Sequence, residues 1–95
     1  MRKYESVFIL PSSMDDKGIA KVVEHIKGVI SENGGESIEI KEPHKKRFSY
    51  PINKMTEGFY VEINFDMEST NLQRIKDSLK HYPDLVRYII VKKEE

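Results

Sequence analysis

The chain has 95 residues, of which 38% are hydrophobic and 34% charged, and its 16 basic and 16 acidic residues give a net charge of zero. This size and balance predict one soluble domain over residues 1–95 with a single modest core. The absence of cysteine excludes a disulfide framework or a thiolate metal site, and no apolar run has the length of a membrane span.

The chain begins with a strand pattern and continues with a helix pattern. Lys3–Leu10 is rich in aromatic and branched residues, and Pro11 ends it. Both faces turn apolar towards its end, which indicates a central strand. Ser12–Ser13 then offers a helix N-cap, with the acidic pair Asp15–Asp16 suited to the positive helix end. Asn33-Gly34-Gly35 ends this helix. Its apolar stripe is Ile19, Val22, Val23, Ile26 and Ile30.

The middle of the chain predicts a hairpin of two strands. Residues 36–52 form a long, irregular strand pattern that Pro43 and His44 interrupt. Residues 53–58 carry turn residues, with Gly58 as the expected positive-φ position. Phe59–Met67 alternates apolar and polar residues and is the clearest strand in the chain. The two runs therefore form a hairpin.

The last third predicts a second helix over Ser69–Tyr82, ended by Pro83, and a final strand over Leu85–Lys93. The element order β-α-β-β-α-β is that of the split βαβ, or ferredoxin-like, α+β fold. With right-handed crossovers, both helices lie on one face of a four-stranded antiparallel sheet in the order 2-3-1-4.

The other face of this sheet is left uncovered. If Phe8 and Val61 point to the helices, the uncovered face carries several apolar residues. Exposed apolar surface of this kind marks an interaction site, although scattered surface hydrophobes are also normal, and both alternatives stay open here. The residues concerned are Val7, Ile9, Tyr60, Ile89 and Val91.

Positive charge gathers between Lys41 and Lys54, where five basic residues accompany one acid, Glu42. This window carries about +4, and the rest of the neutral chain therefore carries about −4. Phe48 and Tyr50 alternate with the charges. Such a patch attracts phosphates. The alternative is a solvated strand edge that lysines keep soluble.

No catalytic pattern accompanies this patch. The three histidines lie far apart without a zinc motif, and there is no nucleophile elbow or glycine-rich phosphate loop. Acylphosphatases share this fold, but the segment P-S-S-M-D-D after the first strand is acidic and lacks their arginine. We therefore expect no enzyme activity, no metal and no cofactor.

Two patterns point to RNA. E-G-F-Y-V-E-I-N-F, residues 57–65, partly matches the third-strand motif of RRM domains, whose aromatic residues stack on unpaired bases. Here Glu57 stands in place of the leading basic residue, and Glu62 and Asn64 would point outward. This face is therefore poorly suited to base stacking.

The second pattern extends over nearly the whole chain. M-R-K-Y-E (1–5), K-R-F-S-Y-P-I-N-K (46–54), E-G-F-Y (57–60) and V-R-Y-I-I-V-K (86–92) together resemble the bacterial small-subunit ribosomal protein S-six family. The stretch 47–54 is the most specific part. The resemblance implies a ferredoxin-like fold and a structural, non-catalytic role in the cytoplasmic ribosome. It also implies binding to the central domain of small-subunit ribosomal RNA, as a heterodimer with the eighteenth small-subunit protein. It implies no membrane and no small-molecule substrate.

The resemblance also implies site residues by matching position. RNA contacts are expected at Arg2, Arg47, Lys54, Arg87 and Lys92, and we add Lys46 on its charge alone.

We place the contact with the partner protein on Phe48, Tyr50, Tyr60 and Ile89, because an apolar contact needs surface that can be desolvated. Many relatives have a longer C-terminal tail that reaches the partner, so here we expect the body of the domain to make the contact. The alternative function is a ferredoxin-like regulatory or ligand-binding module that homodimerises through its open sheet face.

Overall fold

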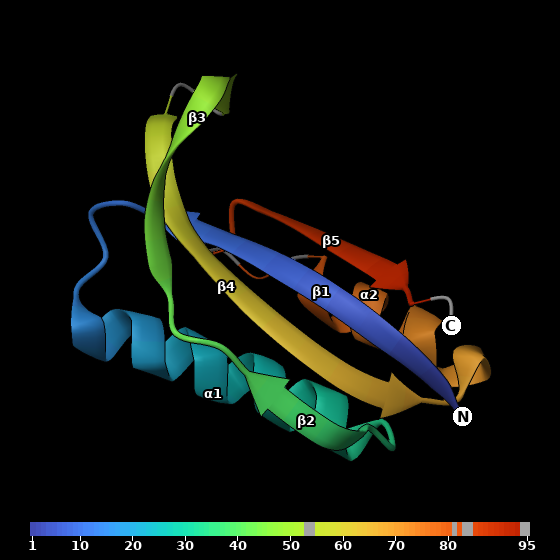
Figure 1. The fold of residues 1–95 in the computed structure, drawn as a ribbon. Helices are drawn as coiled ribbons and strands as arrows, with labels where there is room; N and C mark the ends of the chain where they lie inside the picture. Colours follow the sequence, from blue (N-terminus) through green and yellow to red (C-terminus); the bar gives the residue numbers. More distant parts are fainter. Residues whose placement is uncertain (53–54, 81, 83–84, 94–95) are drawn as a thin grey trace.

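In the computed structural model, which describes residues 1–52, 55–80, 82 and 85–93, the described strands form one antiparallel sheet. Its order is β2-β4-β1-β5, and β3 also pairs with β4 (Figure 1). The strands are β1 (Arg2–Pro11), β2 (Glu36–Ile40), β3 (His44–Ile52), β4 (Met55–Met67) and β5 (Arg87–Lys92).

The predicted second strand is in fact two strands. β2 and β3 both pair with β4, and residues 41–43 separate them. Pro43 has no N–H group to donate, which favours an interruption of the ladder at this point. Counted as one interrupted edge strand, the pair β2–β3 gives the predicted order 2-3-1-4, which is confirmed.

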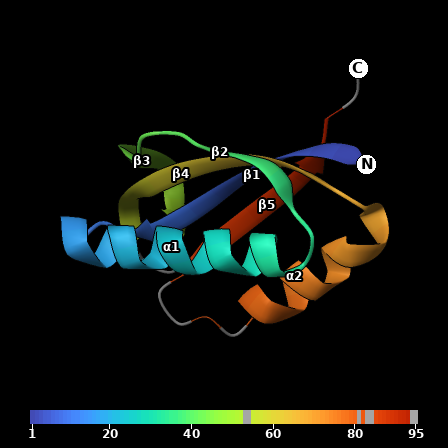
Figure 2. The same cartoon turned by 90° about the horizontal axis from the view of Figure 1, so that it is seen from below.

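Both helices cover the same face of the sheet, as predicted (Figure 2). They are α1 (Asp16–Glu32) and α2 (Leu72–Leu79), and the 3-10 turn η1 (Ser69–Asn71) leads into α2. Asn71 donates to the carbonyl of Asn33 at 3.0 Å, and the Tyr82 ring stacks on His25 with centroids 4.4 Å apart. α2 is shorter than predicted, and the expected helix terminator Pro83 lies outside the described residues.

The core follows from the alternation of β1 and β4 and the apolar stripe of α1. Phe8 and Val61 are opposite each other in the register and are fully buried beneath the helices. Ser6 is the buried polar residue of this layer, and its hydroxyl donates to the carbonyl of Ile63. The fully buried apolar side chains include Phe8, Leu10, Ile26, Ile30, Val61, Ile63, Met67 and Ile75.

Two of the predicted turn and cap positions need correction. The N-cap of α1 is Asp15 rather than Ser12 or Ser13: its carboxylate accepts the Gly18 N–H at 2.8 Å. Gly58 does not have a positive φ but lies within β4, opposite Lys46. At the other end of α1 the prediction is confirmed, since Gly34 has a φ of 87°.

The hairpin of β3 and β4 extends beyond the rest of the sheet (Figure 1). β1 pairs with β4 as far as Pro11 opposite Gly58, and beyond this point the register pairs β4 only with β3. Arg47 lies opposite Glu57 in this outer part. Of the described cations of the basic window, Arg47 therefore lies on this projecting part, and Lys46 lies at its base opposite Gly58.

Candidate nucleic-acid and protein interface

A small aromatic cluster lies on the sheet face that the helices leave open. The rings of Phe48 and Tyr60 have centroids 5.9 Å apart, and Ile9 lies opposite Tyr60 in the register. Gly58 lies beneath them: a Cβ built there would be 2.9 Å from Phe48 Cζ and 3.3 Å from Ile9 Cγ2. The missing side chain at Gly58 therefore lets Phe48 pack down onto the sheet.

Two of the predicted RNA-binding cations border this cluster. The Lys46 Nζ atom lies 5.1 Å from the centroid of the Tyr60 ring, a distance typical of a cation–π contact. Arg87 is opposite Ile9 in the register, and it lines a shallow hollow of about 170 Å³ together with Phe48, Tyr50 and Tyr60. The hollow thus joins a cationic side chain to an aromatic surface.

The four residues predicted to meet a partner protein differ in exposure. Tyr50 is 73% exposed and Ile89 is 55% exposed, whereas Phe48 is only 8% exposed. Tyr60 is intermediate. Phe48 therefore packs against the Tyr60 ring as a buried support, and the accessible apolar surface comes from Tyr50, Tyr60 and Ile89.

The six predicted RNA-binding cations do not form one patch. Lys46 and Arg87 lie on the open face near the hairpin. Arg47 is next to Lys46 in β3 and so points to the opposite face, since neighbouring residues of a strand alternate. Lys54 lies outside the described residues.

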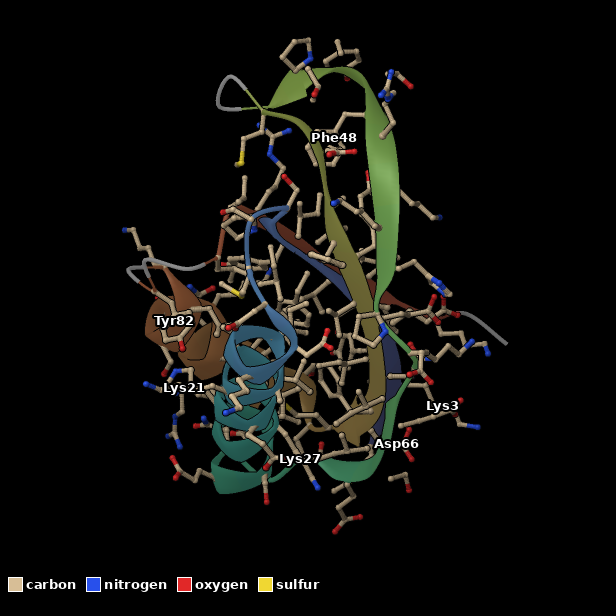
Figure 3. The ribbon with its side chains drawn as sticks, turned by 90° about the vertical axis from the view of Figure 1, so that its left-hand side faces the viewer. Lys3, Lys21, Lys27, Phe48, Asp66 and Tyr82 are labelled. Carbon is tan, nitrogen blue, oxygen red and sulfur yellow. The ribbon has the colours of Figure 1, made fainter. Side chains whose placement is uncertain are left out.

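The remaining two cations, Arg2 and Lys92, lie at the other end of the sheet. Arg2 is opposite Met67, and Lys92 is opposite Tyr4. β1 runs from this end to the hairpin, which corresponds to about 30 Å of extended strand. Figure 3 shows Phe48 at the hairpin end and Lys3 and Asp66 at the end opposite.

Acidic residues of β4 pair with part of the basic window. Lys41 Nζ lies 3.1 Å from a carboxylate oxygen of Glu62, and Lys45 Nζ lies 3.8 Å from Glu57. The hydrogen bond from Lys41 lowers the pKa of Glu62 and raises the pKa of Lys41 itself. The window therefore presents less positive charge than its sequence suggests.

Two residues that shape this surface were not predicted from the sequence as part of it. Gly58 was assigned to a turn, and His44 to an interruption, yet His44 lies opposite Tyr60. His44 also lines a second small hollow of the open face, about 110 Å³ in volume, with Val7, Lys46 and Tyr60. A glycine immediately before the alternating run 59–67 was the available signal for a close backbone approach.

The described residues offer no cluster of three or more histidine or acidic side chains able to hold a metal ion. Among these residues, no helix is both long and apolar enough to cross a membrane.

Comparison with known proteins gives consistent results. The family model described as ribosomal protein S6 matches residues 3–92. The small ribosomal subunit protein bS6 of Carboxydothermus hydrogenoformans is 34% identical over 95 residues, covering 100% of this chain and 99% of that protein. The bS6 protein of Desulfitobacterium hafniense is 32% identical, with full coverage of both chains.

Among solved structures, the 30S ribosomal protein S6 of Thermotoga maritima superposes with a TM-score of 0.82 at 27% identity, covering 97% of this chain and 87% of that one. The C-terminal domain of the Mycobacterium tuberculosis MgtC protein superposes with a TM-score of 0.57 at 14% identity and covers 99% of this chain and 89% of that one. The second likeness concerns the fold alone.

Proposed function

Since the chain belongs to the ribosomal protein S6 family, and is therefore a structural constituent of the small ribosomal subunit, we propose that it binds the central domain of small-subunit ribosomal RNA together with the eighteenth small-subunit protein. Membership of this family also confirms the expectation that the protein is not an enzyme.

The observation that carries the proposal is the hollow on the open sheet face. Tyr50 and Tyr60 give it an apolar wall, and Arg87 gives it a positive charge. A protein side chain can be desolvated against the rings, while the guanidinium group can hold a phosphate in a bidentate contact. The same surface can therefore contact a partner protein through its tyrosines and an RNA phosphate through Arg87.

The charge of the protein explains why a partner is needed. Its net charge is zero, and Lys41 and Lys45 are already paired with acids. These two pairs reduce the positive charge that the basic window offers to phosphates, and the acidic residues elsewhere balance the rest, so affinity from charge alone is modest. A basic partner bound on the open face extends the positive surface, so the pair binds RNA more tightly than either protein alone.

The test is a titration of the central-domain RNA fragment with this protein, with the partner protein and with both, at two salt concentrations. We expect tight, salt-sensitive binding only with both proteins. The double variant Tyr60→Ala/Arg87→Ala should weaken binding by the pair at least about tenfold, since anchors of this kind contribute more than about 1 kcal/mol each. Lys17→Ala/Lys21→Ala on α1 is the matched control and should bind normally.

Two results would overturn the proposal. One is RNA binding by this protein alone that is as tight as binding by the pair. The other is no RNA binding by the pair, with sedimentation equilibrium showing a stable homodimer instead, which is the behaviour expected of a regulatory ferredoxin-like module.

A further inference from the structure

A third hollow lies in the helical layer, between α1 and the strand edge formed by β2 and β3. It has a volume of about 480 Å³, large enough to admit side chains of a bound segment. Its apolar lining includes Ala20 and Val23 of α1, Ile40 of β2 and Phe59 of β4. Figure 3 looks along α1 from its N-terminal end, with the strands β2 and β3 beside the helix.

The local sequence explains why the hollow stays open. Ala20 is exposed, and its single methyl group is too short to reach across to the strands. β2 ends at Ile40. The Lys41 N–H still donates to the Glu62 carbonyl at 2.9 Å, and the paired register with β4 resumes at His44. Ile40 is 36% exposed as a result. The hollow therefore presents apolar surface that neither α1 nor the interrupted edge covers.

The charged residues that line this hollow are all acidic. The cation nearest its Phe59 wall, Lys45, lies 5.7 Å from the ring centroid and is paired with Glu57 at 3.8 Å. Asp16 and Glu24 border it from α1, and Glu42 borders it from the segment between β2 and β3. None of the three has an ion-pair partner in the part of the chain that the structure describes. Their carboxylates repel phosphates and attract Lys and Arg side chains, so the charge of the rim excludes RNA and favours a basic protein segment.

We propose that this acidic hollow docks a basic segment of a partner protein, with one apolar side chain inserted between α1 and β2 and cationic side chains on the surrounding carboxylates. Apolar burial in the centre with charges at the rim is the usual layout of a protein interface. The proposal does not depend on the RNA-binding function, because it uses the opposite layer of the molecule from the open sheet face.

The test uses the full chain and two synthetic peptides, acetyl-Lys-Arg-Leu-Lys-Arg-amide and the same peptide with Ser in place of Leu. Amide chemical shifts are followed during titration at about 0.1 M salt, where exposed charges more than about 10 Å apart are largely screened. We expect saturable shifts confined to α1 around Ala20 and to β2 around Ile40 with the leucine peptide. Binding should be at least about tenfold weaker with the serine peptide, because serine loses the apolar burial that the leucine side chain gains.

The matched variants separate the hollow from general attraction between charges. Glu24→Lys/Glu42→Lys should abolish binding of the leucine peptide. Glu32→Lys/Asp77→Lys makes the same change in net charge away from the hollow and should reduce binding by no more than about threefold, because salt screens the long-range repulsion. Equal loss in both variants, equal binding of both peptides, shifts centred on the β3–β4 hairpin, or no saturable binding would each overturn the proposal.

Discussion

The two glycines Gly58 and Gly28 differ in the space around them, and they therefore affect stability in opposite ways. A Cβ at Gly58 would lie 2.8 Å from the Leu10 carbonyl oxygen and 2.9 Å from Phe48 Cζ, whereas a Cβ at Gly28 would meet nothing within 4 Å. Gly58 thus allows the hairpin to approach β1, while Gly28 only weakens α1.

Alanine substitutions at these two glycines should therefore change stability in opposite directions. We expect Gly58→Ala to lower the free energy of unfolding by about 1–3 kcal/mol, because it forces extra volume into a packed site. Gly28→Ala should raise it by about 0.5–1 kcal/mol, because alanine favours a helix. Urea denaturation measures both, and stabilisation by Gly58→Ala would contradict the packing described here.

The Lys41–Glu62 pair gives a second prediction at a single residue. Glu62 has a pKa below its ordinary value of 4.5, chiefly through the hydrogen bond from Lys41. Its contribution to stability is therefore present above pH 4.5 and is lost as the pH falls through the lowered pKa. Lys41, whose pKa is raised above 10.5, loses its contribution as the pH rises through that raised value.

Lys41→Met should accordingly raise the pKa of Glu62 towards its ordinary value, as measured by carboxyl carbon NMR during an acid titration. Asn64 also donates to Glu62, at 3.3 Å, so a small lowering should remain. Lys93→Met, which removes the partner of Glu5 at 3.7 Å, is the control and should leave the pKa of Glu62 unchanged.

Among the elements, α1 depends on one carboxylate at its start. The Asp15 side chain accepts the Gly18 N–H, and the acidic group also lies at the positive end of the helix dipole. Ser13, two residues earlier, is exposed and does not cap the helix. The choice between these neighbouring cap candidates depends on where the chain leaves β1.

Alanine substitutions at Asp15 and Ser13 distinguish the two candidates for the N-cap of α1. Asp15→Ala should lower the free energy of unfolding by about 1 kcal/mol, the usual cost of losing an N-cap, while Ser13→Ala should change it by less than about 0.5 kcal/mol, as for most surface substitutions. Thermal or urea unfolding followed by circular dichroism measures this. A larger loss of stability in Ser13→Ala than in Asp15→Ala would show that Ser13 is the N-cap.

At the scale of the whole molecule, the proposed RNA contacts divide between two ends of the sheet. Lys46 and Arg87 lie by the hairpin, and Arg2 and Lys92 lie at the far end of β1. Groups this far apart with no shared partner act independently. An RNA that contacts both must follow the long dimension of the protein, which is 36 Å.

The two groups should therefore make additive contributions to RNA binding by the pair of proteins. We expect the double variants Lys46→Ala/Arg87→Ala and Arg2→Ala/Lys92→Ala each to weaken binding. In the quadruple variant, the two changes in binding free energy should add to within about 0.5 kcal/mol. Each lost phosphate contact should also reduce the salt slope by about 1. Wild-type affinity in either double variant would remove that end of the sheet from the interface.

The sequence by itself determined the strand order and the layer to which the helices belong, and it determined the element order except for the division of the second strand into β2 and β3. Two local patterns indicate which side chains are buried. One is the alternation along Phe59–Met67, and the other is the helical spacing from Ile19 to Ile30. The same patterns placed Tyr60 and Ile89 on the open face. The family likeness supplied candidate cations that a charge count alone could not distinguish from other surface lysines.

Only the tertiary structure decided how these residues combine. The pairing of Lys41 with Glu62, the close approach at Gly58 and the separation of Arg2 from Lys46 all depend on which residues of distant strands lie opposite one another. A sequence pattern is periodic and reports the face of a strand, but a shift of register changes every cross-strand neighbour. The charge that remains available to a partner is therefore a property of the folded sheet and not of the basic window taken alone.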